Sequence, residues 1–192
     1  MSQKSKIKNI TISGKICVGN STLAKALAKK LGWRYVNAGD FFRDYCKKHG
    51  LKLEDTEARS DKVRRKVDYK GRETLIRDKN IVYEAKLGGF FAQGIENVLK
   101  VLLVCDDSLR IDRYCNREGV TVSEAKRSIW KRESQNHKVW SKTYHLEWDK
   151  WISDRQINFY SPENYDLVID TFKNSKEETL EKVLRKFRDV KI

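Results

Sequence analysis

A β-rich apolar run, a loop with a glycine at each end and an amphipathic helix follow one another near the start of the chain. The run covers Ile7–Ile12, Gly14 and Gly19 bound the loop, and Ser21 follows it. This order is typical of a phosphate-binding loop, where backbone N–H groups and the helix N-terminus surround a polyphosphate. The predicted phosphate-binding residues are Gly14, Lys15, Ile16, Cys17, Val18, Gly19, Asn20, Ser21 and Thr22.

One position departs from the usual pattern of such loops. Asn20 stands where a lysine is expected, directly before Ser21, and a lysine occurs instead at Lys15. An ordinary strand–turn–helix unit, with glycines serving only the turn, is the alternative interpretation. The context favours nucleotide binding, because apolar residues recur at helical spacing after the loop and Gly32 can end that helix.

Length and composition favour one α/β domain over residues 1–192. A 39% hydrophobic content and a single proline argue against general disorder and long linkers. We find no apolar run of membrane-spanning length and no signal-peptide core, so we expect no membrane association. The four cysteines lack a metal-binding spacing, which predicts reduced thiols in a cytoplasmic protein, without disulfide or zinc.

The chain carries a net charge of +14, and residues 1–80 account for most of it. A solvated basic surface explains most of these side chains. A polyanion partner is the functional alternative, either nucleotide phosphates in the site or RNA along the basic N-terminal half. No motif that recognises nucleic acid is present, so RNA is the secondary expectation.

Five β-rich runs alternate with helical stretches, which predicts a five-stranded parallel sheet flanked by helices. The runs are Ile7–Ile12, Trp33–Val36, Asn80–Glu84, Val98–Cys105 and Tyr165–Asp170. Ligands of such sheets bind at the carboxyl ends of the strands. Capping boxes at Thr121 and Ser175 mark two helix starts. The charged, aromatic region from about 121 to 160 is predicted to be helical and to project from the core.

Four segments in this order resemble cytidylate kinases of the archaeal type, within the nucleoside monophosphate kinases. They are the loop I-T-I-S-G-K-x-x-x-G-x-S-T, then N-A-G-D-F-F-R at 37–43, then V-Y-E-A-K-L-G-G-F at 82–90, and finally R-E-G at 117–119, R-E at 132–133 and Y-D-L-V-I-D-T at 165–171. The resemblance implies a P-loop kinase fold, with a monophosphate-binding region at about 38–79 and a lid at about 113–160. It also implies ATP as phosphoryl donor, Mg²⁺ held by Ser21, and a monomer that phosphorylates CMP or dCMP.

The resemblance assigns the acceptor to Gly39, Asp40, Arg43, Asp68, Glu84 and Lys86. Arg43 matches the family's acceptor-phosphate arginine, since a bidentate guanidinium suits a phosphate dianion. Its alternative is an ordinary surface arginine in a basic region. Asp68 lies in a stretch predicted to be helical, 58–78, and matches an aspartate near the base, with a helix-surface carboxylate as the alternative. Lys86 replaces a family arginine, so it keeps the charge and loses the fork.

The lid would supply cations for the transferring phosphoryl group. Lys15, Arg113, Arg117 and Arg132 are the candidate catalytic residues, with Arg132 nearest the transferring phosphate and Arg113 or Arg117 nearest the donor. Thr171 and Lys173 would lie beside the adenine. A second lid arginine of the family is Val139 here, and the neighbouring Lys138 is a poor substitute because it points about 100° away on a helix.

Asn20, Lys86 and Val139 each remove or soften a phosphate cation. Two alternatives therefore stay open beside an active (d)CMP kinase. One is a kinase-fold scaffold with weak or lost transfer activity that binds nucleotide or RNA. The other is a kinase for a different acceptor, because this fold hosts several acceptors.

Overall fold

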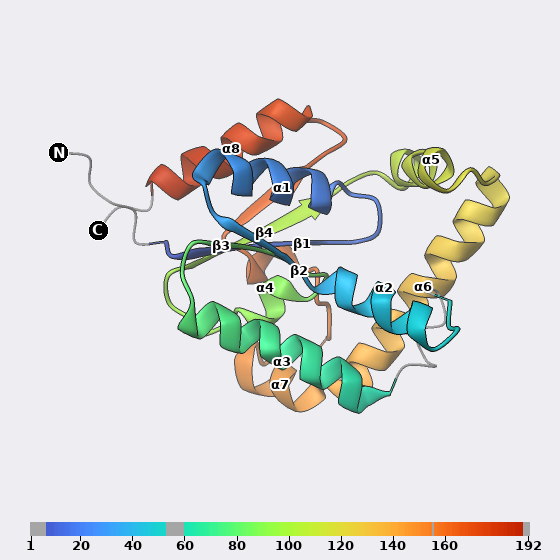
Figure 1. Cartoon of the computed structure of the whole chain (residues 1–192), viewed down its shortest axis with the longest axis horizontal. Coiled ribbons are helices and arrows are strands. Elements are labelled where there is room, and N and C mark those ends of the chain that lie inside the picture. The colour runs from blue at the N-terminus through green and yellow to red at the C-terminus, as the bar shows by residue number, and fades with distance from the viewer. Residues whose placement is uncertain (1–6, 53–59, 155, 190–192) are drawn as a thin grey trace.

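The computed structural model describes residues 7–52, 60–154 and 156–189, which form an α/β sheet with helices on both faces (Figure 1). The strands are β1 (Asn9–Gly14), β2 (Arg34–Asn37), β3 (Ile81–Glu84), β4 (Val98–Val104) and β5 (Leu167–Asp170). The helices are α1 (Asn20–Leu31), α2 (Ala38–Lys48), α3 (Asp61–Arg77), α4 (Gly88–Phe91), α5 (Asp107–Glu118), α6 (Val122–Thr143), α7 (His145–Trp151) and α8 (Lys176–Asp189). A short 3₁₀ helix covers Pro162–Asn164.

The five strands pair in parallel in the order β2-β3-β1-β4-β5, which confirms the predicted sheet. The strand ends differ from the prediction. β1 runs two residues farther because Ser13 and Gly14 pair with the long strand β4. β5 begins at Leu167 because Tyr165 still belongs to the preceding 3₁₀ turn, where its N–H donates to the Pro162 carbonyl at 3.1 Å.

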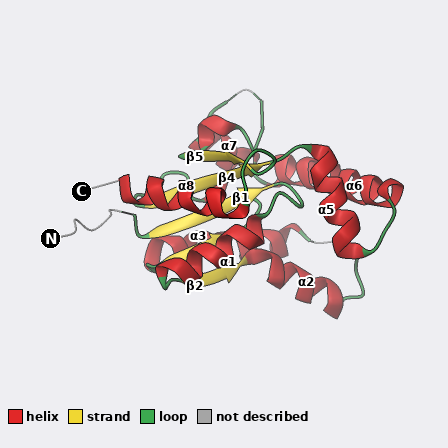
Figure 2. Cartoon of the chain, turned by 90° about the horizontal axis from the view of Figure 1, so that it is seen from above, coloured by secondary structure: helices red, strands yellow, loops and turns green. Residues whose placement is uncertain are grey.

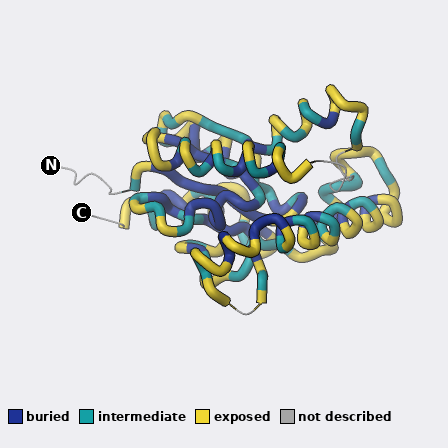
Figure 3. Tube along the Cα trace, turned by 90° about the horizontal axis from the view of Figure 1, so that it is seen from below, coloured by how far each residue is buried: buried dark blue, intermediate teal, exposed yellow. Residues whose placement is uncertain are grey.

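Helices cover the two faces of the sheet unequally. α1 and α8 lie side by side over one face, and α3, α4 and α7 lie on the other (Figures 1 and 2). Ile10, Leu27 and Val183 belong to the apolar core beneath α1 and α8 and are fully buried. Burial is concentrated in the middle of the sheet, whereas the outward sides of the helices are exposed (Figure 3). The central strand β1, whose six residues are all buried, therefore carries the phosphate loop at the centre of the sheet.

The second half of the region 121–160 packs onto the body of the protein, so the predicted projection is wrong there. Trp140, Tyr144 and Trp148 recur every four residues and pack with Phe90 of α4. The Phe90 and Trp148 rings stack with centroids 6.0 Å apart. The first part of α6 leaves Trp130 55% exposed, as a projecting helix would. This half lies on the body of the protein because it covers the aromatic side chains of α4, a long-range contact that the local sequence does not reveal.

The predicted helix termini are confirmed. Thr121 accepts from the Glu124 N–H, and the Glu124 carboxylate accepts from the Thr121 N–H at 2.9 Å. Ser175 and Glu178 exchange the equivalent two bonds at 3.1 and 2.7 Å. Gly32 ends α1 with a left-handed φ of 66°.

None of the described helices has the length and apolar character needed to cross a membrane. All four cysteines are free thiols. Part of the basic N-terminal half, residues 1–6 and 53–59, lies outside the described residues, as does the start of the predicted helical stretch 58–78. The remainder of that stretch is α3, which confirms the prediction for it.

Gly71→Ala is expected to destabilise the protein although alanine is the better helix former. A Cβ at this position of α3 would overlap the buried Tyr83 hydroxyl. Overpacking costs roughly 1–3 kcal/mol, against a helix-propensity gain of about 1 kcal/mol. The net loss of up to about 2 kcal/mol should lower the thermal midpoint by up to roughly 8 °C. Lys70→Ala, on the exposed side of the same helix, is the matched control and should not lower it; an unchanged midpoint in Gly71→Ala would contradict the predicted overlap.

Candidate functional site

The phosphate loop leaves the central strand at the carboxyl edge of the sheet. A Cβ on Gly14 would lie 2.6 Å from the Leu103 carbonyl oxygen and 2.7 Å from a Val18 methyl carbon, so only glycine fits. Gly19 has a left-handed φ of 102°. The loop opens on a cleft of about 1420 Å³, here called the main cleft. Both predicted glycines thus have a physical reason in the loop geometry.

Side chains hold five consecutive carbonyl groups of the loop. Asn20 donates to Gly14 O, Arg110 to Ile16 O, Arg113 to Cys17 O and Thr171 to Val18 O, at 2.8–3.2 Å, and Asn20 also reaches Lys15 O at 3.5 Å. In a trans peptide the N–H points opposite to the preceding C=O. The N–H groups of Cys17, Val18 and Gly19 therefore point away from these donors, and these three residues line the main cleft.

Asn20 has a structural role that the sequence did not reveal. Its side-chain amide lies 3.1 Å from the Gly14 carbonyl oxygen, across the mouth of the loop. This neutral group ties the start of the loop to its end. The expected cation is thus replaced by a loop-closing amide, while Lys15 also lines the main cleft.

Ser21 and Glu84 form an oxygen-rich corner beneath the loop. The Ser21 hydroxyl donates to Glu84 Oε1 at 2.6 Å, and the Tyr35 hydroxyl donates to the other carboxylate oxygen. Partial burial and the neighbouring Glu84 carboxylate raise the pKa of Tyr35, which keeps it a hydrogen-bond donor. Hydroxyl and carboxylate oxygens are the ligands that Mg²⁺ prefers, so these residues fit the metal that the sequence predicted.

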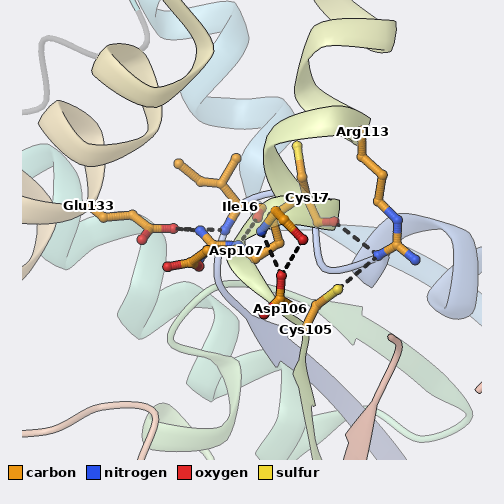
Figure 4. Close-up of polar contacts among 9 residues, drawn as sticks. Ile16, Cys17, Cys105, Asp106, Asp107, Arg113 and Glu133 are labelled. Carbon is orange, nitrogen blue, oxygen red and sulfur yellow. Dashed lines mark hydrogen bonds and ion pairs between the residues drawn. The ribbon is translucent and has the colours of Figure 1, made fainter. Parts of the chain in front are cut away.

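Arg113 is fixed at the opposite wall of the main cleft. Its guanidinium donates to Cys17 O at 3.2 Å, to Thr171 Oγ1 at 3.1 Å and to Thr171 O at 3.2 Å. It also lies 3.6 Å from the Cys105 sulfur (Figure 4). These contacts hold the predicted nucleotide-side residues Arg113 and Thr171 together against the loop.

The other predicted residues of the main cleft are placed less uniformly. Thr22 and Arg117 line it, and the Arg117 guanidinium lies 5.2 Å from the Tyr114 ring centroid. Lys173 does not line the cleft; its side chain is 77% exposed and lies 3.9 Å from Asp170. The neighbouring Asn174 lines the cleft instead.

A smaller cavity of about 80 Å³, here called the middle cavity, adjoins the main cleft. Its polar lining residues are Arg64, Asp68, Lys86, Arg132 and Asn136. Gly39, Phe42 and Trp140 supply apolar surface. The cavity joins residues from α2, α3, the β3–α4 connection and α6, which are far apart in sequence. The resemblance assigned Gly39, Asp68, Lys86 and Arg132 to one reaction, and these four residues indeed lie together.

Asp68 is the most perturbed acid of the site. Burial raises its pKa to about 7, against the opposing effects of the Tyr144 hydroxyl and Arg64. Tyr144, itself fully buried, donates to Asp68 Oδ2 at 2.6 Å. Asp68 is 8% exposed, so the surface-carboxylate alternative is wrong. A buried carboxyl poised near neutrality can donate or accept a hydrogen bond in the middle cavity.

Arg43 lies at the edge of the main cleft, one turn into α2. Asn37 caps this helix by accepting from the Gly39 N–H at 2.8 Å. Asp40 pairs with the Arg43 guanidinium, which lines the main cleft and is about half exposed. Asp40 lines neither cavity, so its contact with the site runs through Arg43.

Two cations connect the cavities. Lys86 and Arg132 each line both the main cleft and the middle cavity. The Lys86 ammonium lies 5.9 Å from the Trp140 ring centroid, which gives this lysine an aromatic support. Val139 is partly buried on α6 and lines neither cavity.

Sequence reasoning missed several lining residues. Asn136 and Trp140 follow Arg132 at four-residue spacing, so helical periodicity could have found them. Arg64 precedes Asp68 by four residues on α3, so the same periodicity could have found it. Tyr144, which bonds Asp68 but does not line the cavity, gave no such signal, because only the packing of α3 against the end of α6 brings it to Asp68.

Similarity to solved structures supports the fold. An uncharacterised protein from Eubacterium ventriosum superposes with a TM-score of 0.67 at 15% identity, covering 94% of this chain and 98% of that one. A gluconokinase from Sinorhizobium meliloti gives 0.60 at 12% identity, with 98% and 95% covered. A shikimate kinase from Acinetobacter baumannii gives 0.54 at 16% identity, with 93% and 92% covered. The fold is thus that of P-loop kinases.

Sequence comparison gives the family. A model of the cytidylate kinase-like family matches residues 9–173. The cytidylate kinase of Pyrococcus abyssi is 34% identical over 171 residues, which cover 88% of this chain and 87% of that protein. The cytidylate kinase of Archaeoglobus fulgidus is 30% identical over 179 residues, with 92% of each chain covered. With the phosphate loop and the two joined cavities at the expected edge of the sheet, the chain belongs to the cytidylate kinase-like family.

Proposed function

We propose that the protein transfers the γ-phosphoryl group of ATP to CMP or dCMP and forms the corresponding diphosphate. One observation carries the proposal: Gly39, Lys86 and Arg132 line both the main cleft and the middle cavity. A donor on the phosphate loop and an acceptor in the middle cavity would meet between two cations. The names of the curated relatives support the choice of acceptor.

The main cleft provides for the donor. N–H groups of the phosphate loop and the α1 N-terminus would bind its β- and γ-phosphates. Arg113 lines the main cleft, where its planar guanidinium would stack on an adenine. Ser21 would hold Mg²⁺, with Glu84 as hydrogen-bond partner. The metal would neutralise charge on the β- and γ-phosphates when bound.

The middle cavity and the adjoining part of the main cleft, where Arg43 lies, would provide for the acceptor. Arg43 would bind the monophosphate with its planar fork, oriented by Asp40. Asp68 would bind the pyrimidine edge, held in place by Tyr144. A cytosine presents an amino donor beside a ring-nitrogen acceptor, which a carboxyl group that can accept or donate would match.

The transfer itself needs little covalent help from the protein. An oxygen of the acceptor phosphate attacks the γ-phosphorus, that P–O bond forms, and the bond to the β–γ bridging oxygen breaks to leave ADP. The acceptor oxygen is already anionic at neutral pH, so no general base is required. Lys15, Lys86 and Arg132 would stabilise the charge that develops on the moving group.

A second candidate is a kinase for another acceptor, which the lysine at position 86 and the nonpolar Val139 favour. A scaffold without transfer activity is the third. A coupled assay of ADP release, together with a measurement of ATP binding, separates the three candidates. We expect ADP release with CMP or dCMP to exceed that with UMP, AMP and GMP. Preference for another monophosphate would favour the second candidate. Absence of turnover with every acceptor, despite ATP binding, would favour the scaffold. RNA binding, the monomeric state and the cytoplasmic location stay predictions.

Arg43→Ala is expected to raise KM for the monophosphate or lower kcat, by roughly tenfold or more, because a charge-assisted contact contributes about 1.5–3 kcal/mol. ATP affinity should change little, because Arg43 extends from α2 beside Gly39 and makes none of the contacts that hold the phosphate loop. Steady-state kinetics with each substrate varied would measure both effects. Arg34→Ala, which also breaks an exposed arginine–aspartate pair, is the matched control. Equal losses of ATP and monophosphate binding would contradict the assignment.

Asp68→Asn is expected to change how stability depends on pH. The native carboxyl has a pKa of about 7 and the unfolded one an ordinary value near 4, so between these pH values the native state binds more protons. The free energy of unfolding contributed by Asp68 therefore falls as pH rises from about 4 to 7, by at most about 4 kcal/mol, and is constant above. Denaturation of both proteins from pH 4 to 8 should show this decline in the wild type relative to Asp68→Asn. Parallel curves would contradict the shifted pKa.

A further inference from the structure

The buried Arg110 and the partly buried Glu133 form an ion pair behind the phosphate loop that the proposed reaction does not use. Arg110 extends from α5 and is 2% exposed. Its guanidinium pairs with Glu133 of α6 and with Asp107 of its own helix. Its Nε also donates to the Ile16 carbonyl oxygen at 2.8 Å. The pair therefore links two helices to one residue of the loop.

Glu133 binds that same loop residue through its other backbone group. The Ile16 N–H donates to Glu133 Oε1 at 3.3 Å (Figure 4). Both polar backbone groups of Ile16 are thus fixed, the carbonyl by α5 and the N–H by α6. Figure 4 shows the Glu133 side chain extending from α6 toward the loop.

The carboxylate lies outside the phosphate cradle. Glu133 lines a third cavity of about 230 Å³, together with Lys15, Ile16 and Tyr160, and does not line the main cleft. It therefore does not occupy the space where a donor phosphate would bind. Competition with nucleotide is not the role that this geometry favours.

Arg132 directly precedes Glu133 on α6, and its side chain lines different cavities from those that Glu133 lines. Consecutive helical residues point about 100° apart. While Glu133 holds the outside of the loop, Arg132 lines the main cleft and the middle cavity. A contact that fixes Glu133 on the loop therefore fixes the distance of Arg132 from the loop.

The far end of α6 is anchored independently. The Thr143 hydroxyl donates to Asp61 of α3 at 3.1 Å, and Tyr144 donates to Asp68. Arg65 of α3 donates to the Thr143 carbonyl. The helix is therefore held at two points, at Glu133 and at this anchor. The α6 residues that line the middle cavity lie at or between these points.

We infer that Glu133, with Arg110, is a positioning residue that holds Arg132 over the phosphate loop for phosphoryl transfer. The inference rests on the proposed function for its kinetic part. A purely structural role is the competing explanation, since any broken buried ion pair lowers stability. The two differ in whether the loss of activity depends on Arg132.

A double-mutant cycle on kcat separates these explanations. Glu133→Gln retains an oxygen that can accept from the Ile16 N–H, so it should lower kcat by roughly tenfold. Glu133→Ala removes that oxygen and should lower kcat by up to roughly a hundredfold, because small displacements of a positioned group have effects of that size. KM for ATP should change less than about threefold. In an Arg132→Ala background, Glu133→Ala should cause little further loss. Additive losses would overturn the inference.

Asp166→Asn is the control, because it breaks an ion pair with Lys100 at the amino end of β5, away from the carboxyl edge that carries the site. It should leave kcat unchanged. Amide hydrogen exchange gives a readout without turnover: Glu133→Ala should speed exchange in peptides containing Ile16 and residues 128–136, and Asp166→Asn should not. Unchanged exchange would overturn the anchoring. Absence of wild-type turnover with every acceptor would refute the proposed function alone, with the anchoring still decided by exchange.

Discussion

The site depends on one loop whose carbonyl groups accept hydrogen bonds from side chains on the side away from the main cleft. Five consecutive carbonyls, from Gly14 to Val18, accept from side chains of α1, α5 and the end of β5. A short glycine-bounded loop has no regular partners of its own, and buried carbonyls without partners are costly. Satisfying them on one side fixes the peptide planes, which leaves N–H groups for an anion on the other. The cradle is therefore preorganised before any phosphate binds.

The same bonds tie distant elements to the loop and so build the rest of the site around it. Arg113 and Thr171 bind each other as well as the loop, which sets the wall of the main cleft. Arg110 brings α5 and, through Glu133, α6 to Ile16. The aromatic side chains of Trp140, Tyr144 and Trp148 pack the other end of α6 and the start of α7 against α4, and Tyr144 also donates a hydrogen bond to Asp68. Packing that stabilises the fold thus also sets the width of the middle cavity.

Sequence reasoning succeeded where the signal is local. Strand–loop–helix order, capping boxes and apolar runs depend on neighbours in the chain, so the parallel sheet, the glycines and the helix starts could be predicted. It failed where tertiary packing decides: the second half of 121–160 lies on α4 because of Phe90, and Asp68 is buried because Tyr144 covers it. The residues that line the two cavities were predicted in part, since the resemblance named Lys86 and Arg132, whereas the contact of Tyr144 with Asp68 depends on packing alone.

The three departures from the family pattern have different physical consequences. Asn20 exchanges a mobile cation for a bond that closes the loop, so the cradle keeps its shape with less positive charge. Lys86 keeps its charge and gains an aromatic support from Trp140, which restricts a lysine that would otherwise be more mobile than an arginine. Val139 has no such compensation, and it lines neither the main cleft nor the middle cavity. If transfer is slow, the cause should therefore be sought in the charge around the γ-phosphate and not in the shape of the loop. In that case Arg132 carries a larger share of the stabilisation, and the pair that fixes its position matters more in this chain than in relatives with a second lid arginine.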